Sequence, residues 1–338
     1  MIIIRPIRSS DYDALHQIAI ESGHGFTSLP VNEEQLINRI NRATQAVHKS
    51  DEGCGDEGYL FVMEDTSTGT VIGTTGIESA VGLHDAFYHY HLGKVVHSSR
   101  ELNIYNTVEI LSLNNDYTGA TELCTLYLRD NYRVNNNGRF LSKVRFLFMA
   151  EQQQRFNNTV IAEMRGVSDD NGSSPFWEWL EEHFFSMDFP TADYLTGIGK
   201  KEFIAELMPK YPIYVNLLSQ AAQEVIGQVH DKTLPALRLL QSEGFVNRGY
   251  VDIFDGGPTV ECELNSIRTI QNSSRLTVNI GEVTSKHKHM LANTRIVDFR
   301  AAQTTADIDI EQQTITINQE CADALKVSNG DMLRVAAS

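Results

Sequence analysis

A polar loop between a strand-like run and a helical pattern carries residues whose types and spacing point to anion binding. Arg133, Asn136, Asn137 and Gly138 lie in this loop, which follows the run 122–128. The first backbone N–H groups of a helix lack partners within the helix, and the helix dipole favours negative charge there. An arginine adds a permanent positive charge with a fork geometry that suits phosphate. The sequence therefore predicts a cradle for a pyrophosphate group at this junction.

The elements that must position this loop are a mixture of strands and helices. Apolar runs bounded by turn residues predict strands at 2–4, 59–63, 71–77, 107–113, 122–128, 159–164, 250–254 and 259–264. Apolar residues at helical spacing predict helices that begin near Ser10, Asn32, Gly138 and Pro235, and Ser10 and Asn32 are expected to cap the first two. The polar, aromatic-rich stretch 84–97 supports no assignment. This order predicts an α+β fold.

A change in residue pattern divides the chain into two expected parts. Residues 1–265 are expected to form the main domain. Within it, the stretch from 168 to 228 is mixed and mostly helical, which indicates an insertion. β-type segments dominate after Asn265, with a short helix near the end of the chain. We therefore expect a small β-rich C-terminal domain over residues 266–338.

Composition and charge disfavour several classes of protein. The 338 residues include 28 Lys and Arg against 44 Asp and Glu, and the net charge of −16 disfavours nucleic acid and anionic lipid as partners. No apolar run approaches the roughly 20 residues that cross a bilayer, and charged residues follow the N-terminus too early for a secretory signal. We therefore expect a cytoplasmic protein. The four scattered cysteines form no C-x-x-C pair, and the two His-x-His pairs lack an obvious third ligand, so no disulfide or metal site is expected.

The polar loop resembles the acyl-coenzyme A loop of the GNAT acyltransferase family, which reads Arg/Gln-x-x-Gly-x-Gly/Ala between the fourth strand and its helix. The segment from Arg133 to Gly138 matches with one departure, because Asn136 stands where the first glycine is usual. Asparagine tolerates a positive φ better than most residues, so the loop can still form. The resemblance implies a GNAT-type mixed, mainly antiparallel sheet flanked by helices. It also implies that the fourth and fifth strands splay apart around the pantetheine arm, with Leu126 beside the thioester.

Longer strings resemble the bacterial arginine N-succinyltransferase family along nearly the whole chain. They include GHGFTSLP, VGLHDAFYHYHLGKVVH, AEMRGV, SPFWEWLEEHFFSMDF, EVIGQVH and DIFDGGPTVEC. This resemblance implies transfer of a succinyl group from succinyl-coenzyme A to the α-amino group of L-arginine, the first step of an arginine degradation route. Succinyl-coenzyme A is then a substrate, and no tightly bound cofactor is implied.

The same resemblance implies that His230, at the end of EVIGQVH, is the catalytic proton donor. A histidine suits this role because its unperturbed pKa of about 6.5 lets it exchange protons near neutral pH. Glu163 and Arg165 lie two residues apart on an expected strand, so their side chains point to the same face. They are candidates to bind the guanidinium of arginine and the free carboxylate of the succinyl group, respectively. The alternative is an exposed ion pair on a strand.

Two other functions remain open at the level of sequence. The amino substrate could be ornithine, or both ornithine and arginine. The chain could also be a catalytically silent GNAT-fold module that binds coenzyme A and regulates or assembles with a partner. The expected partners are small-molecule substrates. Homo-oligomerisation is common in metabolic enzymes, but no residue pattern here demonstrates it.

Overall fold

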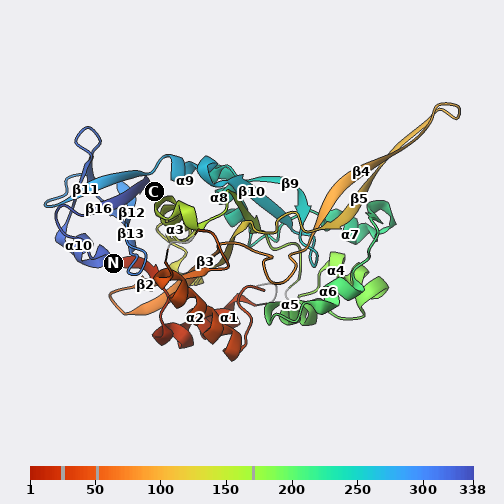
Figure 1. The fold of residues 1–338 in the computed structure, drawn as a ribbon, viewed down its shortest axis with the longest axis horizontal. Coiled ribbons are helices and arrows are strands. Elements are labelled where there is room, and N and C mark those ends of the chain that lie inside the picture. Colours follow the sequence, from red (N-terminus) through yellow and green to blue (C-terminus); the bar gives the residue numbers. More distant parts are fainter. Residues whose placement is uncertain (24–26, 51–52, 170–171) are drawn as a thin grey trace.

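A long mixed sheet runs through the computed structural model, which describes residues 1–23, 27–50, 53–169 and 172–338 (Figure 1). Neighbouring strands pair antiparallel except for β6 with β7 and β11 with β15. From one edge, the main part of the sheet contains β1 (Ile2–Pro6), β2 (Gly58–Asp65), β3 (Thr70–Glu78), β6 (Thr121–Leu128), β7 (Thr159–Glu163), β10 (Pro258–Glu263), β9 (Val246–Val251), β4 (His89–Ser99), β5 (Ile104–Asn114) and β8 (Ile213–Tyr214). Within the described residues, no helix is both long enough and apolar enough to cross a membrane.

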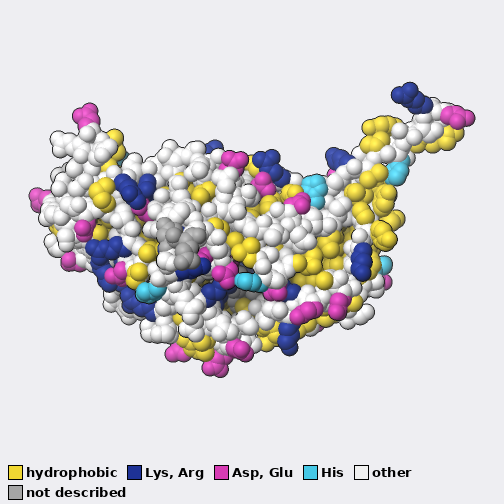
Figure 2. Space-filling model, viewed as in Figure 1, with side chains coloured by type: hydrophobic (Ala, Val, Ile, Leu, Met, Phe, Trp, Pro, Cys, Tyr) yellow, Lys and Arg dark blue, Asp and Glu magenta, His cyan; other side chains and the backbone are white. Residues whose placement is uncertain are grey.

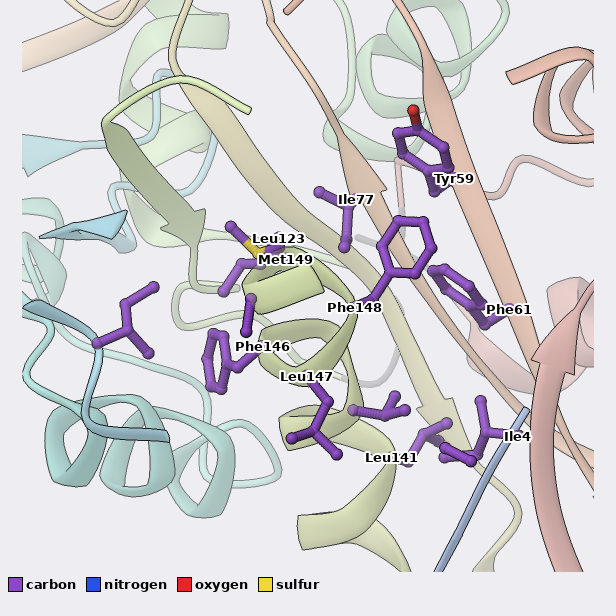
Figure 3. Close-up of a cluster of buried hydrophobic side chains, with 14 of the residues drawn as sticks. Ile4, Tyr59, Phe61, Ile77, Leu123, Leu141, Phe146, Leu147, Phe148 and Met149 are labelled. Carbon is purple, nitrogen blue, oxygen red and sulfur yellow. The ribbon is translucent and has the colours of Figure 1, made fainter. Parts of the chain in front are cut away.

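Helix α3 (Asn137–Glu151) lies at the centre of the largest hydrophobic core. Its side chains from Phe140 to Glu151 are all buried, so the helix is enclosed on every side. One side packs on the sheet, where Leu147 and Phe148 belong to the same cluster as Phe61 and Ile4 (Figure 3). Other sides contact α9 (Arg268–Gln271) and the C-terminal strands β12 and β16.

Helices α1 (Tyr12–Ser22) and α2 (Glu33–His48) cover the opposite face of β2 and β3. Leu36 and Ile40 of α2 pack with Leu60 of β2. The side chains of Tyr59 and Phe61, on either side of Leu60, point to the other face and pack with α3. Asn32 caps α2 as expected, and its side-chain oxygen accepts a hydrogen bond from the backbone N–H of Gln35, 3.1 Å away. The two helices therefore attach to the sheet through one apolar stripe.

The expected cap at Ser10 is wrong. Helix α1 begins at Tyr12, and the preceding residue Asp11 shapes the turn before it. The Asp11 carboxylate accepts a hydrogen bond from the backbone N–H of Arg8 and forms a buried ion pair with Arg5, at 2.8 and 2.7 Å. The ion pair with Arg5 of β1 thus holds Asp11 in position in this turn.

The unassigned stretch 84–97 contains most of β4, which pairs with β5 along its full length. Figure 1 shows this hairpin projecting from the body, and Figure 2 shows hydrophobic side chains along it. Leu102 and Tyr105 near its tip are 68% and 71% exposed. Beyond the point where β4 leaves β9, both faces of the hairpin meet solvent. The alternation of apolar and polar residues that marks a half-buried strand is therefore weak here.

Residues between 168 and 228 fold mainly as short helices around a second hydrophobic cluster. Trp177 and Phe176 pack there against Tyr90 and Leu111 of the hairpin base. The elements of this stretch are α4 (Pro175–Leu180), a π-helical turn (Glu181–Phe185), α5 (Phe189–Gly197), α6 (Glu202–Leu207), β8, a 3-10 turn (Val215–Leu217) and α7 (Gln220–Val225). Helix α8 (Leu234–Glu243) follows and leads into β9.

The C-terminal part is β-rich and extends the main sheet. Strand β13 pairs antiparallel with β1, with Ile3 opposite Ala302 and Ile4 opposite Ala301. The buried carboxylate of Glu151 in α3 also forms ion pairs with two arginines of this part. Its elements are β11 (Ser274–Ile280), β12 (Lys288–Asn293), β13 (Ala301–Thr305), β14 (Asp307–Asp309), β15 (Thr314–Ile317), α10 (Gln319–Leu325) and β16 (Met332–Ala337). The expected α+β fold, with helices on both faces of the sheet and a small β-rich C-terminal domain, is confirmed.

Candidate active site

The two central strands β6 and β7 run parallel and then separate. They pair only at Thr121 with Val160 and at Glu122 with Ile161, although β6 continues to Leu128. Beyond Glu122, β6 pairs only with β3 on its other side. We call the region where β6 continues without β7 the β6–β7 divergence. Leu126 lies in it.

The backbone of β6 is distorted where the divergence begins. Thr125 has a φ of 55°, in the left-handed region, and the register with β3 shifts between Thr74 and Gly76. An extra residue of this kind is a β-bulge, which re-aims the backbone groups that follow it. The bulge therefore changes how β6 presents Leu126.

The loop after β6 leads directly into the N-terminus of α3, and its role as a cradle for pyrophosphate stays a prediction. Asn135 and Asn136 have φ values of 53° and 64°, so the departure from glycine is accommodated by two asparagines in the left-handed region. The side-chain amide of Asn137 donates a hydrogen bond to the carbonyl oxygen of Tyr132, 3.1 Å away. This bond fixes the turn that precedes the helix, and the N-terminus of the helix can accept an anion.

Arg133 and Gly138 complete the cradle. The Nε–H of Arg133 donates to the carbonyl oxygen of Leu128 at 3.0 Å, and the half-exposed guanidinium lies 3.1 Å from Asp130. A methyl group added at Gly138 would meet only a Leu128 side-chain atom at 3.8 Å, which is an ordinary contact. Protein packing therefore does not require glycine at position 138, whereas close approach of a ligand would.

His230 lies in the loop after α7 and is tied to the end of β7. Its backbone N–H donates to the carbonyl oxygen of Arg165 at 2.9 Å, and Val229 forms an isolated bridge with Gly166. The backbone N–H of Lys232 donates to Nδ1 of the imidazole at 3.1 Å. A neutral ring that accepts at Nδ1 carries its proton on Nε2. The loop thus orients His230 as a donor through Nε2.

The turn 255–257 packs closely against the end of β7, and at Gly257 it leaves no space for a side chain. Asp255 accepts hydrogen bonds from the backbone N–H groups of Gly166 and Gly257, at 2.6 and 2.8 Å. A methyl group at Gly257 would lie 2.2 Å from the carbonyl oxygen of Met164. Burial, with Asp252 nearby, raises the pKa of Asp255 well above its ordinary value. This packing fixes the position of Arg165 between Met164 and Gly166.

Three carboxylates form a row on the face opposite α3. Glu78 of β3 lies directly opposite Glu122 of β6, and Glu122 pairs with Ile161, two residues before Glu163. Residues opposite one another or two apart share a face, so all three side chains point the same way. Burial, with Glu163 and then Glu78 nearby, raises the pKa of Glu122 to about 8. Burial, with Asp252 nearby, raises the pKa of Glu163 to about 8.

The partners of this acidic row are unevenly distributed. Glu78 forms ion pairs with Arg39 and Arg42 of α2, at 3.2 and 2.6 Å. Nε2 of His89 lies 2.9 Å from Oε1 of Glu163, but burial lowers the pKa of His89 to about 4, so its ring is neutral at pH 7. Within the described residues, Glu122 accepts no hydrogen bond and forms no ion pair. The row therefore holds more carboxyl groups than cations paired with them, and a cationic ligand would favour the ionised forms of Glu122 and Glu163.

The pattern of residues along the whole chain matches one family. Residues 2–269 match the model described as arginine N-succinyltransferase beta subunit, and residues 274–337 match the C-terminal domain of the same subunit. The chain belongs to the arginine N-succinyltransferase family. The expected family and its acyltransferase class are thereby confirmed.

Individual relatives of this family align over nearly their full length. Arginine N-succinyltransferases of Escherichia coli strains 55989 and K12 DH10B are each 49% identical over 337 residues, covering 99% of this chain and 97% of the relative. The solved structure of arginine/ornithine succinyltransferase subunit AI from Pseudomonas aeruginosa has a TM-score of 0.92 at 34% identity. The alignment covers 100% of this chain and 98% of the P. aeruginosa chain. The fold described above is therefore that of an arginine N-succinyltransferase.

The predicted site residues of this arginine N-succinyltransferase chain fall into two groups. Leu126 and the cradle lie along the divergence and at the N-terminus of α3, while Glu163, Arg165 and His230 gather at the end of β7. Sequence reasoning missed Glu122 and Asp255. The sequence marks Glu122 only as a charged residue in the predicted strand 122–128. For Asp255, the two glycines that follow it indicate a tight turn.

Proposed function

We propose that this enzyme transfers a succinyl group from succinyl-coenzyme A to the α-amino group of L-arginine, in cytoplasmic arginine catabolism. Family membership supports the reaction. The observation that carries it within the molecule is the β6–β7 divergence, which leads directly into a cradle at the N-terminus of α3. A pyrophosphate would bind at Asn136, Asn137 and Gly138 with Arg133 beside it, and the pantetheine arm would follow β6 toward Leu126.

The reaction takes place by direct attack in a ternary complex. The α-amino nitrogen, after losing a proton from its ammonium form, attacks the thioester carbonyl carbon and forms the C–N bond. The C–S bond then breaks, and the thiolate of coenzyme A accepts a proton. That proton is the second one that the attacking nitrogen loses as the amide forms, the first having passed to water. His230 donates a hydrogen bond from Nε2 to the leaving sulfur and stabilises the developing thiolate, in agreement with the hydrogen bond that Nδ1 accepts from Lys232. Holding both substrates in line contributes much of the rate.

The amino substrate is bound through its second cationic group. Glu163 and Glu122 receive the guanidinium of arginine, because within the described residues they form the part of the acidic row that has no ion pair with an arginine or a lysine. Glu122 lies four residues before Leu126, at most about 13 Å along β6, because the bulge at Thr125 shortens the strand. An extended arginine and a glutamate side chain together bridge this distance, with the α-amino group at the thioester. Arg165 remains the arginine proposed from the sequence for the succinyl carboxylate.

Ornithine is the second candidate substrate, and one observation favours it. The solved relative from P. aeruginosa is named an arginine/ornithine succinyltransferase and is similar along the whole chain. Both amino acids present the same α-amino group and a cationic end. A carboxylate pair accepts a planar guanidinium through two parallel hydrogen bonds, which an ammonium cannot form. We therefore propose arginine as the preferred substrate.

Release of free coenzyme A thiol tests this function directly. Purified enzyme is assayed with succinyl- or acetyl-coenzyme A and with arginine, ornithine, lysine or no amine. Release that requires both succinyl-coenzyme A and arginine supports the proposal. A higher kcat/KM for ornithine would keep the chemistry and change the substrate. Coenzyme A binding without release under any combination would contradict the enzyme assignment and favour a silent binding module.

A further inference from the structure

A buried cation lies on α3 without an anionic partner. Arg145 is 2% exposed, and its Nε and Nη2 donate to the carbonyl oxygen and the hydroxyl of Ser142, at 2.9 and 2.8 Å. Within the described residues, it forms no ion pair and Nη1 donates no hydrogen bond. A buried charge without a counter-ion is strongly unfavourable, and here burial lowers the pKa of Arg145 to about 10. The guanidinium nevertheless remains protonated at neutral pH.

The thiol of Cys124 on β6 cannot neutralise Arg145. Among the described residues, it is the titratable side chain that acts electrostatically on this guanidinium. Burial raises the pKa of this thiol to about 12, so it is uncharged at pH 7. The other arginine near Cys124 is Arg39, which approaches from α2 and is already paired with Glu78. Within the part of the chain that the structure describes, Arg145 is therefore left without a negative charge beside it.

The position of Arg145 along α3 places it beside the expected thioester. Gly138 lies beside Leu128, and α3 follows β6 through a short loop and packs against it, so the two elements run antiparallel, in agreement with the electrostatic interaction between Arg145 and Cys124. The seven residues from Gly138 to Arg145 span ~10 Å of helix, and the four residues from Leu128 back to Cys124 span ~13 Å of strand. The two segments are therefore similar in length. Helical side chains tilt toward the helix N-terminus, as the bonds to Ser142 show. The guanidinium therefore lies level with residues 124–126 of the β6–β7 divergence.

We propose that Arg145 binds the free carboxylate of the succinyl group and thereby sets the acyl-donor specificity of the enzyme. This inference rests on the proposed function. An acyl group whose thioester lies beside Leu126 and whose chain extends on the α3 side of β6 passes the level of Arg145, while arginine lies toward the acidic row on the opposite face. A succinyl carboxylate there supplies the missing counter-ion. Bidentate pairing of a guanidinium with a carboxylate is among the stronger charge-assisted contacts in proteins. A donor without the carboxylate leaves the buried charge uncompensated, so the site disfavours it.

Arg165 is the competing candidate, and the same experiment distinguishes the two. Its Nη2 donates to the hydroxyl of Ser168 at 2.9 Å, and it lies at the end of β7 next to the His230 loop. Arg155 provides a matched control. It is also buried, but it donates to the hydroxyl of Tyr59 and to the carbonyl oxygen of Lys49.

The experiment measures kcat/KM for succinyl-coenzyme A and for butyryl-coenzyme A, which has a similar length but no carboxylate, at saturating arginine. We expect the wild type to prefer succinyl-coenzyme A by at least about a hundredfold. Arg145→Met should reduce this ratio at least about thirtyfold, chiefly through slower succinyl transfer, with butyryl transfer kept or increased. Arg145→Lys retains the charge and should fold even if the methionine variant does not. It should lower the ratio about tenfold, because the ammonium lacks the guanidinium fork.

Several outcomes would overturn the inference. Equal use of both donors by the wild type would do so without any variant. An unchanged ratio in folded Arg145→Met or Arg145→Lys would also do so, and a collapse of the ratio in Arg165→Met alone would assign the carboxylate to Arg165. Arg155→Met should leave the ratio unchanged while lowering the melting temperature. If the wild type turns over no donor with any amine, the proposed function itself fails, which differs from turnover without donor preference.

Discussion

The backbone N–H of Lys232 donates a hydrogen bond to Nδ1 of His230, 3.1 Å away. The two residues lie in one short loop, so this bond holds the imidazole in a single tautomer with its proton on Nε2. The backbone N–H of His230 is in turn bonded to Arg165 at the end of β7. The loop, rather than the histidine alone, therefore determines which ring nitrogen carries the proton and can donate a hydrogen bond.

Removal of the His230 imidazole should slow succinyl transfer without loss of donor binding. We expect His230→Ala to lower kcat about 10²- to 10⁴-fold, the usual range for a positioned acid or base. The affinity for coenzyme A should remain within about threefold of the wild type, because the cradle lies on α3. Thiol release and calorimetric titration with coenzyme A measure the two quantities. His287→Ala, at an exposed histidine, is the control, and equal activity of both variants would exclude a catalytic role for His230.

Neutralising Glu163 should weaken binding of the amino substrate selectively. A charge-assisted hydrogen bond contributes about 1.5–3 kcal/mol, so Glu163→Gln should raise the KM for arginine by about 10- to 100-fold. The KM for succinyl-coenzyme A should change little. Glu109→Gln, at an exposed glutamate of β5, serves as the matched control. A larger effect on succinyl-coenzyme A than on arginine would show that Glu163 serves the donor instead.

Stability should depend on pH through Glu122. Burial raises the pKa of this carboxyl to about 8 in the folded protein, whereas an unperturbed glutamate has a pKa of about 4.3. Between these values the folded state binds more protons than the unfolded state. The contribution to stability is therefore complete below about pH 4.3 and is lost as the pH rises through about 8. Glu122→Gln removes this dependence.

Melting temperatures at pH 5, 7 and 8.5 measure the effect of Glu122. The melting temperature of Glu122→Gln minus that of the wild type should increase steadily with pH. A difference that is constant across this range would mean that Glu122 keeps an ordinary pKa in the folded protein. Saturating arginine should also release protons near pH 7 if its guanidinium ionises the Glu122–Glu163 pair, and calorimetry in buffers of different ionisation enthalpy detects this release.

A methyl group at Gly257 should destabilise the enzyme severely. The added atom would lie 2.2 Å from the carbonyl oxygen of Met164, so either β7 or the turn 255–257 must move. We expect Gly257→Ala to lower the free energy of unfolding by more than about 3 kcal/mol, at the upper end of single substitutions. Gly93→Ala is the control, because its methyl group meets only Ile110 at 3.6 Å. Chemical denaturation of both variants gives the comparison, and equal stabilities would contradict the proposed packing.

Local sequence determined several parts of this molecule. The cap at Asn32 and the helix start that follows the loop from Arg133 to Gly138 depend on residues within one turn of each other, so their spacing was sufficient to predict them. The alternating strands and helices likewise followed from apolar periodicity. Similarity along the chain indicated the family. These features depend on short-range contacts, or on patterns that are retained in relatives.

Only the tertiary structure decided the charge environment of the site. Ser10 does not cap α1 because Asp11 pairs with Arg5 of the neighbouring strand. Glu122 has no local feature that distinguishes it from other strand glutamates, and its raised pKa arises from burial and from carboxylates on two other strands. Arg145 resembles any helical arginine in the sequence. It becomes a buried cation without a partner because the packing around α3 removes water and supplies no carboxylate. Burial and pairing across distant segments are long-range properties, and periodicity does not encode them.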